Sequence, residues 1–343
     1  MNREARTLAR EVARACRALD LPGRSVLVAV SGGVDSSVLL HVLHQLASRF
    51  SFKLLIGHVN HGLRADSAED AEAVRALGER CGVPVALARV EPARLRVAGP
   101  SRSRPTLQEA ARRLRYAALY EMARVGNAER IATAHTQDDQ AKTVLLRLMR
   151  GCGPDGLGGI PERSNDGVVV RPLLSVPRSS VLQYAQATGL AWREDPSNRS
   201  ERFARSRLRT QWLPGLAAAF NPKLLRVVAA LAEAQRRDAE WLASLVAREA
   251  QQRFQSEPQG LRIDAQGFEG LPAALARRLL RAALTELGMG REVTRRHLER
   301  MTEFLCRAGP GKTLELPGGL RLVRERQALR LLRAEKVRPE DAC

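Results

Sequence analysis

A buried-strand pattern near the N-terminus runs straight into glycines, hydroxyls and one carboxylate, and few folds accommodate that order. The stretch is VLVAVSGGVDSSVLLH at residues 26–41, and an apolar helix pattern follows from about Ser36. A strand that enters a helix through a glycine turn places backbone N–H groups at the positive end of the helix dipole, on the carboxyl edge of a parallel sheet. We therefore expect a seat for phosphate groups at this turn.

The acidic residue in this turn requires an explanation. Asp35 lies among the hydroxyls of Ser31, Ser36 and Ser37, which can donate hydrogen bonds to a phosphate. A carboxylate there would repel the phosphate unless a cation lay between them, so Asp35 favours Mg²⁺ that bridges the carboxylate and a polyphosphate. The alternative is that Asp35 only caps the helix or offsets its dipole. The turn is not a Walker A loop, because it lacks the lysine of that motif.

Strand patterns and helix patterns alternate through the first half of the chain. The expected strands read SVLVAV, FKLLIGHVN, VPVALARV and RIATAH, and the expected helices begin near Ser36 and cover residues 66–80, 106–125 and 138–149. This alternation predicts an α/β fold with a parallel sheet covered by helices. The glycine-rich segment 150–167 has no periodicity and predicts an irregular loop near a site.

The second half of the chain has a different pattern. Residues 222–253 and 272–307 show the apolar spacing of amphipathic helices, and the tail alternates apolar and polar residues around Pro317 as in a β-ribbon. A glycine segment at 309–313, GPGKT, predicts a turn, because it leads into a strand pattern rather than a helix pattern.

These patterns predict two domains. An α/β domain is expected at residues 1–215, with the boundary near Pro214, and a smaller, mostly helical domain that ends in the β-ribbon is expected at residues 216–335. A chain of 343 residues is long enough for two hydrophobic cores.

The charge balance favours a polyanionic partner. The chain has 56 Lys and Arg against 37 Asp and Glu, a formal net charge of +19, and nearly all of the cations are arginines. Guanidinium groups bind phosphates bidentately, so this excess favours nucleic acid. A GC-rich genome, which encodes Arg in place of Lys, would explain the choice of Arg but not the excess of cations.

Two absences from the sequence bear on the compartment and on the chemistry. No stretch approaches roughly 18 uninterrupted apolar residues and charge is spread through residues 1–20, so we expect a cytoplasmic protein that is not bound to a membrane. The cysteines are scattered without a C-x-x-C pair, so no zinc site, iron–sulfur cluster or redox disulfide is expected. They are Cys16, Cys81, Cys152, Cys306 and Cys343.

The phosphate-seat turn resembles a known nucleotide-binding motif. Residues 31–36, SGGVDS, match the SGGxDS loop of the PP-loop ATP pyrophosphatases, which split ATP between its α and β phosphates and adenylate a substrate. Further matches lie at residues 58–64, 108–116, 134–151, 156–160, 171–174 and 192–209. With them the chain resembles the tRNA(Ile)-lysidine synthase family, whose fold is a Rossmann-like PP-loop domain. The helical region is similar to the first C-terminal domain of that family, and we expect the second such domain of longer members to be missing.

The resemblance implies a two-step ligation that forms a C–N bond. ATP and Mg²⁺ would serve to adenylate the C2 oxygen of the wobble cytidine, position 34, in the CAU anticodon of tRNA(Ile), with release of pyrophosphate. The amine of L-lysine would then attack C2 and release AMP. The product, lysidine, pairs with A instead of G and changes decoding from AUG to AUA. The oligomeric state stays open, with a homodimer as one option.

The resemblance also implies roles for individual residues. Asp35, Asp139 and Arg205 would be catalytic, with both carboxylates holding magnesium and Arg205 offsetting charge on the adenylated base. The residues expected around ATP are Ser31, Gly32, Gly33, Val34, Asp35, Ser36, Ser37, His58, Asn60, Arg64 and His135. Those expected on the tRNA or substrate side are Arg112, Tyr116, Arg150, Arg171 and Asp195, and the basic run 199–209 is expected to contact phosphates.

Three residues depart from the family pattern. Lys142 stands where the pattern AHHxxDQAET has Glu, Thr136 replaces its second His, and Ser206 replaces an Asn. Because Lys142 puts a cation where the pattern has an anion, it is not included among the metal ligands. Two other functions therefore stay open: a tRNA-binding PP-loop protein with altered catalysis, and a tRNA thiolase. The thiolase would need a catalytic or cluster-binding set of cysteines.

Overall fold

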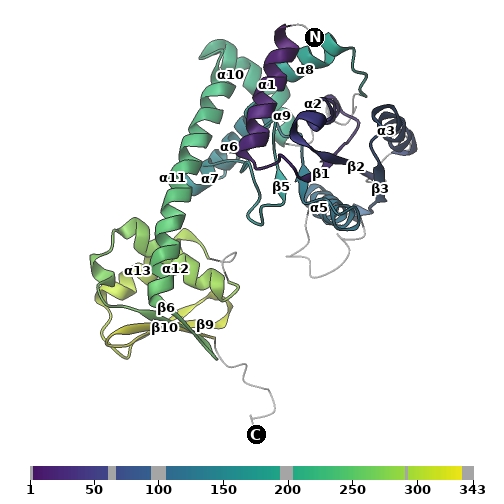
Figure 1. Ribbon diagram of the computed structural model, residues 1–343. Coiled ribbons are helices and arrows are strands. Elements are labelled where there is room, and N and C mark those ends of the chain that lie inside the picture. Colours follow the sequence, from purple (N-terminus) through teal and green to yellow (C-terminus); the bar gives the residue numbers. More distant parts are fainter. Residues whose placement is uncertain (1–2, 61–66, 94–105, 194–203, 290–292, 334–343) are drawn as a thin grey trace. The chain divides into compact units, whose positions relative to one another are not determined.

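The computed structural model describes residues 3–60, 67–93, 106–193, 204–289 and 293–333 (Figure 1). The chain divides into two compact units, Met1–Arg236 and Arg237–Cys343. The division lies inside one continuous helix, α11 (Leu224–Arg253).

A five-stranded parallel sheet forms the centre of the first unit, in the order β3-β2-β1-β4-β5. Its strands are β1 (Ser25–Ala29), β2 (Lys53–Asn60), β3 (Val85–Arg89), β4 (Arg130–Ala132) and β5 (Val169–Val170). The central strand β1 pairs with β2 on one side and β4 on the other, in the register Val28↔Ile56 and Val28↔Ala132. The chain therefore leaves β1 at the point where the strand order reverses, which is where ligands bind in open α/β sheets.

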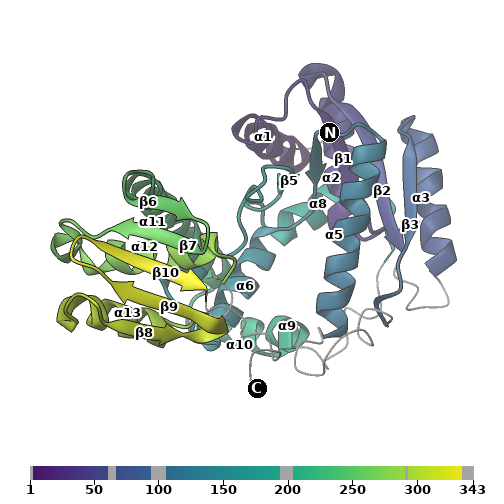
Figure 2. The ribbon, with the colours of Figure 1, turned by 90° about the horizontal axis from the view of Figure 1, so that it is seen from below.

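Helices cover both faces of this sheet (Figure 2). The helical elements of the first unit that precede α11 are α1 (Arg3–Ala18), α2 (Val34–Phe50), α3 (Ser67–Cys81), α5 (Leu107–Val125), α6 (Gln137–Met149), α7 (Pro154–Leu157), α8 (Arg178–Thr188), α9 (Ala204–Arg207), a π-helical turn (Leu208–Trp212) and α10 (Leu213–Ala219). The expected helices are confirmed, because α3, α5 and α6 each lie within two residues of the predicted range.

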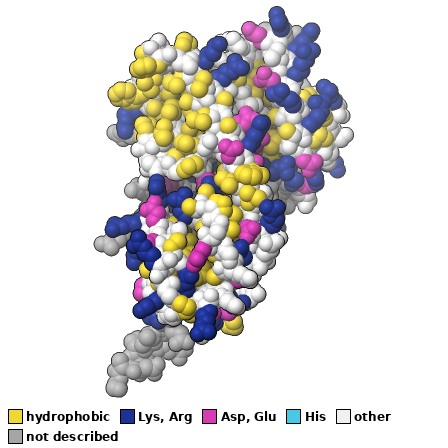
Figure 3. Space-filling model, turned by 90° about the vertical axis from the view of Figure 1, so that its left-hand side faces the viewer, with side chains coloured by type: hydrophobic (Ala, Val, Ile, Leu, Met, Phe, Trp, Pro, Cys, Tyr) yellow, Lys and Arg dark blue, Asp and Glu magenta, His cyan; other side chains and the backbone are white. Residues whose placement is uncertain are grey.

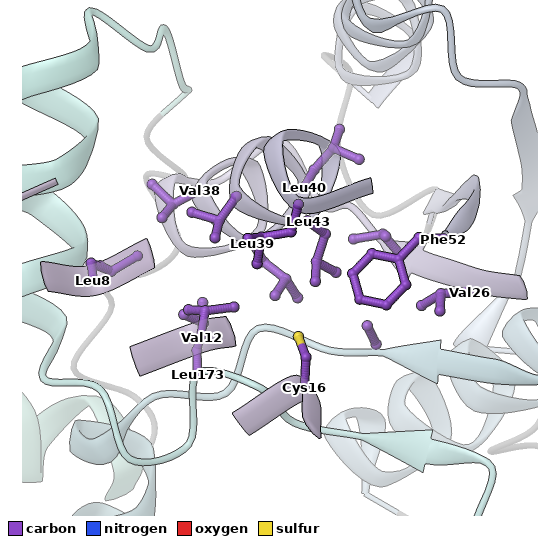
Figure 4. Close-up of a cluster of buried hydrophobic side chains, with 14 of the residues drawn as sticks. Leu8, Val12, Cys16, Val26, Val38, Leu39, Leu40, Leu43, Phe52 and Leu173 are labelled. Atoms are coloured by element: carbon purple, nitrogen blue, oxygen red, sulfur yellow. The ribbon is translucent and has the colours of Figure 1, made fainter. Parts of the chain in front are cut away.

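The alternation of side chains along β1 explains the two layers of helices. Val26 and Val28 point to one core, where α1, α2 and α8 contribute residues such as Leu8 and Val38 (Figure 4). Leu27 points to the opposite core and packs with Leu119 of α5. A strand that buries both faces needs consecutive apolar residues, and β1 provides them from Val26 to Ala29.

The second unit is built on an antiparallel sheet in the order β6-β7-β10-β9-β8. Its elements are β6 (Phe254–Glu257), β7 (Gly260–Asp264), a 3-10 turn (Phe268–Gly270), α12 (Ala273–Glu286), α13 (Arg295–Arg307), β8 (Thr313–Leu316), a second 3-10 turn (Pro317–Gly319), β9 (Leu320–Arg324) and β10 (Ala328–Arg333). Residues of α12 and α13 pack on this sheet around Leu280, Met301 and Leu331.

The helices of the second unit follow the expected pattern, but its sheet is larger than a terminal ribbon. The predicted ribbon around Pro317 corresponds to β8, β9 and β10, and GPGKT forms the turn that leads into β8. The hairpin of β6 and β7 adds two strands that the sequence pattern did not indicate. β6 reads FQSE and leaves its side chains half-buried or exposed, so it lacks an apolar alternation.

The division between the units lies later in the chain than the expected boundary at 215/216. The first turns of α11 belong to the first unit because Val228 and Ala232 pack against Ala141 and Val144 of α6. A continuous helix hides this change, since no Gly or Pro marks it. Among the helices that the structure describes, no single one is both long and apolar enough to cross a membrane. One pair bent by 97°, Ala204–Ala219 with Leu224–Arg253, passes on length and composition together.

Candidate nucleotide and substrate site

Two loops meet at the carboxyl edge of the parallel sheet. One follows β1 and contains Ser31, Gly32 and Gly33, and the other follows β4 and contains His135 and Thr136. Because β1 and β4 are hydrogen-bonded neighbours, these two loops lie side by side at the same edge. The predicted site residues of both loops are thereby brought together.

The first loop is held by its own hydroxyl groups. The Ser36 hydroxyl donates to the carbonyl of Gly33 at 2.9 Å and accepts from the backbone N–H of Ser31 at 3.1 Å. Gly32 has a φ of +84°, a left-handed conformation that a residue with a Cβ adopts only at a cost. The turn then delivers Gly33 as the N-cap of α2, with no side-chain cap on its N-terminal N–H groups. These N–H groups and the dipole of α2 form a positive seat for an anion.

Asp35 lies in the first turn of α2 and is only partly neutralised. Its Oδ2 lies 3.5 Å from Nε of Arg178, whereas its Oδ1 is buried and has no hydrogen-bond partner among the described residues. Burial raises the pKa of Asp35, the Arg178 guanidinium lowers it, and the Asp139 carboxylate raises it further. A buried carboxylate oxygen without a donor is a position at which a cation would bind.

The second loop places a neutral imidazole beside the sheet edge. The Thr133 hydroxyl and Nδ1 of His135 are 3.0 Å apart. Burial lowers the pKa of His135 to about 3, the nearby Asp139 opposes this shift, and Arg171 is one of the cations that add to it. His135 is therefore uncharged at neutral pH and can act as an acceptor or a neutral donor.

Asp139 lies in the first turn of α6 and is surrounded by donors. Its Oδ2 accepts from the backbone N–H of Thr136 at 3.2 Å and from the Thr136 hydroxyl at 3.3 Å. Its Oδ1 lies 2.9 Å from Nζ of Lys142 and 3.2 Å from a terminal nitrogen of Arg205. Burial acts to raise the pKa of Asp139, but Lys142 and Arg205 outweigh it and hold this pKa well below its usual value. Lys142, Arg205 and Asp139 thus form one ion cluster.

Asp138, the acid next to Asp139, has a structural role. Oδ2 of Asp138 accepts the backbone N–H of Arg178, the first residue of α8, at 2.9 Å. Asp138 therefore ties α8 to the start of α6 and stabilises an otherwise unpaired helix N–H. Of the two adjacent carboxylates, only Asp139 lies among the cations of the site.

The glycine-rich segment packs against α6. The Gln140 side chain donates to the carbonyl of Ile160 at 3.1 Å and accepts the Ile160 N–H, and Arg147 donates to the carbonyls of Gly156 and Gly159. Gly159 has a φ of +63°, and a Cβ there would collide with the Gln140 amide. The glycines let this loop lie flat on α6 and fix its position.

The remaining residues expected around ATP are placed as follows. His58 is buried in β2, and its Nδ1–H donates to the carbonyl of Val30 at 2.8 Å, so it supports the strand end that precedes the turn. Asn60 ends β2, and Val34 and Ser37 are buried in the first turns of α2. Arg64 lies outside the described residues, as does Asp195 from the tRNA or substrate side.

The arginines expected on the substrate side divide into two places. Arg112 of α5 stacks on the ring of Tyr116 at 5.0 Å, and Arg171 is 6% exposed and donates to the carbonyl of Pro161. Arg112 and Arg171 both act electrostatically on His135. Arg150 lies instead at the far end of α6, is exposed, and acts electrostatically on Glu109.

Two arginines of the site were not anticipated. Arg178 pairs with Asp35, and Arg115 of α5 stacks on Tyr116 at 5.5 Å and acts on His135. The helical spacing of three residues from Arg112 could have indicated Arg115. No sequence signal relates Arg178 to Asp35, because the contact depends on how α8 returns to α2. The described residues contain no group of three or more His, Cys, Asp or Glu side chains that could hold a metal ion.

Comparisons with known proteins identify the class of this fold. A PP-loop domain model matches residues 4–216, and a model of the TilS substrate binding domain matches residues 263–330. The fold also resembles that of the U34-tRNA thiolase NcsA from Methanococcus maripaludis, with a TM-score of 0.56 and 17% identity over 68% of this chain and 80% of that one. The fold and the matched domain therefore define a PP-loop protein.

Curated relatives narrow this class. A tRNA(Ile)-lysidine synthase from Methylobacterium nodulans is 40% identical over 82% of this chain and 80% of its own length, and one from Nostoc sp. is 33% identical over 86% and 87%. The chain belongs to the tRNA(Ile)-lysidine synthase family. It spans 64% of the length of the relative from Solibacter usitatus, which is 38% identical over 86% of this chain.

Proposed function

We propose that this protein ligates L-lysine to C2 of the wobble cytidine in the CAU anticodon of tRNA(Ile), using ATP and forming an adenylated cytidine on the way. The observation that carries the proposal is the meeting of two loops at one sheet edge in a chain of this family, with Asp35 after the first loop and Asp139, paired with Arg205 of α9, after the second. The first loop supplies an anion seat, and the second supplies cations beside it.

The loop of residues 31–37 would hold the phosphates of ATP. The N–H groups at the start of α2 and the left-handed turn at Gly32 support this assignment, since backbone N–H groups at a helix N-terminus attract an anion. Arg205 would face the reacting base, because a guanidinium held by Asp139 is oriented before substrate binds.

Asp35 is the residue whose environment fits Mg²⁺. Its Oδ1 is a buried carboxylate oxygen without a donor in the described part of the chain, and carboxylate oxygen is a preferred magnesium ligand. When bound, the ion would neutralise charge on the phosphates. Asp139 fits a metal less well, since all of its contacts are to donors and cations and it could join only by giving up Lys142 or Arg205.

A tRNA and a cytoplasmic location complete the proposal. The net charge of +19 and the Lys and Arg side chains spread over the surface drawn in Figure 3 suit a polyanionic substrate. Affinity for the tRNA should fall steeply with salt, by roughly 0.7 to 0.9 log units per phosphate contact and log unit of salt.

A second candidate is a tRNA-binding PP-loop protein with altered catalysis, and Lys142 favours it. The ammonium of Lys142 lies at Asp139, so the site has a cation where the family pattern has an acid. A thiolase is less favoured, because burial raises the pKa of the Cys16 thiol to about 12 and no metal-binding cysteine cluster occurs among the described residues.

Incubation with ATP, L-lysine and a tRNA(Ile) transcript tests the proposal, with mass spectrometry of the wobble base and assay of AMP release. We expect lysidine from the wild-type protein and at least a hundredfold slower AMP release from Asp35→Asn, with tRNA binding unchanged. Glu79→Gln, a change at an exposed acid of α3, is the control. An unmodified base with wild-type protein would favour the binding protein over the ligase.

A further inference from the structure

A second charged region lies next to the ion cluster, and its residues are mostly cations. Arg112 and Arg115 of α5 and Arg171 after β5 act together on His135, and Arg205 also acts on Arg115. The contributing segments are far apart in sequence, so the fold gathers them rather than a local charge run.

The counter-charge in this region is small. In the described part of the chain, Asp139 is the carboxylate that opposes the effect of these cations on His135, and it is already paired with Lys142 and Arg205. Arg115 is half-buried and forms no ion pair with a described carboxylate. The contact that the described residues offer its guanidinium is the face of Tyr116, which is a weak interaction.

Two buried donors in the same region have no acceptor. Nε of Arg171 has no hydrogen-bond partner among the described residues although the side chain is only 6% exposed, and the buried hydroxyl of Tyr116 has none either. Leaving such groups unpaired is costly, so their persistence indicates that an acceptor arrives with a ligand. Guanidinium and phenol donors match an oxyanion.

We propose that Arg115, Arg171 and the Tyr116 hydroxyl form a seat for an oxyanion of the second substrate. The oxyanion is the α-carboxylate of the amino acid or a phosphate of the RNA, and both have the planar or forked oxygens that a guanidinium binds bidentately. The excess of cations, increased by Lys142, excludes an ammonium group from this seat. The inference rests on the proposed function, because it names a group of that reaction's own substrates.

Paired variants on α5 test the seat. Arg115→Met removes a guanidinium of the seat, and Arg113→Met removes an exposed one from the neighbouring position of the same helix. The first measurement is thermal stabilisation by inorganic phosphate. Phosphate bound at the PP-loop should stabilise both variants equally, so a difference between them reports on the seat. We expect about tenfold weaker phosphate binding for Arg115→Met than for Arg113→Met.

Two further measurements identify the source of the oxyanion. If it is the carboxylate, the KM for L-lysine in AMP release rises about tenfold in Arg115→Met while the Kd for tRNA stays within about twofold. If it is an RNA phosphate, the Kd for tRNA rises about tenfold and its salt slope becomes shallower by about one. Equal values for both variants in all three measurements would overturn the seat. If the wild-type protein released no AMP, the proposed ligation would be contradicted. The measurements of phosphate and tRNA binding would still test whether the seat exists.

A second pair of variants guards against misfolding. Tyr116→Phe removes a hydroxyl that has no hydrogen-bond partner in the part of the chain that the structure describes, so it should weaken oxyanion binding by about threefold without loss of stability. Tyr120→Phe is its control on the same helix, because the Tyr120 hydroxyl donates to Asp166 and its loss should lower stability without affecting the ligand. The reverse pattern in the two variants would contradict the proposal.

Discussion

The two loops at the sheet edge carry one central carboxylate each, and they treat it in opposite ways. Asp35, after β1, keeps a buried oxygen to which no described residue donates, whereas Asp139, after β4, has both oxygens bonded to donors or cations. The first loop is held by its backbone conformation and its own hydroxyl groups, and Oδ1 of Asp35 is available to a ligand. In the second loop, side chains form hydrogen bonds and ion pairs with one another.

This difference teaches how folding and binding are divided within one site. Burying a carboxylate without partners lowers stability, and burying a paired one removes that penalty. The pKa values follow the same division, since that of Asp35 is raised, with burial as the largest cause, while that of Asp139 is lowered by Lys142 and Arg205 despite burial. Loss of either carboxylate should therefore change stability with opposite sign.

The largest effect is expected from Asp139→Asn. This change leaves the Lys142 ammonium, whose side chain is only 8% exposed, without its anion, and should lower the free energy of unfolding by about 3 kcal/mol. Urea unfolding of the variant and the wild type measures the difference. A loss of less than 1 kcal/mol would show that the cluster contributes little to folding.

The pH dependence of unfolding sharpens the same point. The folded pKa of Asp139 lies below its unfolded value of 3.8, so its contribution is present above about pH 4 and is lost as pH falls through the folded pKa. The unfolding free energy of the wild type should fall below about pH 4 more steeply than that of Asp139→Asn. Parallel curves would contradict the assigned cause.

Restoring an acid at position 142 should make the second loop resemble the first. Lys142→Glu places two carboxylates together and should cost about 2 kcal/mol in EDTA, and Mg²⁺ should recover most of this loss. Lys142→Met loses the same ion pair without gaining a ligand, so Mg²⁺ should not restore it. Equal responses of the two variants to Mg²⁺ in thermal unfolding would show that the ion binds elsewhere.

The backbone half of the site was predictable from sequence, and the side-chain half was predictable only in part. The glycines and hydroxyls of residues 31–37 form a local turn, so adjacent letters determine its geometry. The parallel strands and the helices between them followed from periodicity for the same reason. The predicted magnesium role of Asp139 stays a prediction. The sequence did not indicate that Lys142 and Arg205 would both pair with this carboxylate.

Contacts between distant segments account for what sequence reasoning missed. Arg178 reaches Asp35, and Arg115 and Arg171 gather near His135, only because strands β4 and β5 and helices α5 and α8 pack at one edge. Similarly, no residue in the sequence marks the point within α11 at which the first unit ends, since the apolar spacing of this helix continues from the first unit into the second. Local patterns identify elements, whereas the partners of a charged side chain depend on the assembled fold.

A smaller effect is expected from glycine changes in the first loop. Gly32→Ala forces a Cβ into a left-handed backbone and should cost about 1 kcal/mol, even though open space surrounds the position. Gly33→Ala is the matched control, because Gly33 has an ordinary φ of −76° and a Cβ there would make only a 3.6 Å contact. Equal losses of stability would mean that the left-handed conformation of Gly32 does not limit this turn.

The smallest effect, and the one with the opposite sign, is expected from Asp35→Asn. Burial raises the pKa of Asp35, so at pH 7 its ionised form opposes folding, and removing the charge should raise the unfolding free energy by about 0.5 kcal/mol. Urea unfolding in EDTA measures this gain, and saturating Mg²⁺ should reverse the order of the two proteins because only the carboxylate binds the ion tightly. A variant less stable than the wild type in EDTA would mean that Arg178 already satisfies this carboxylate, and the contrast between the two loops would then disappear.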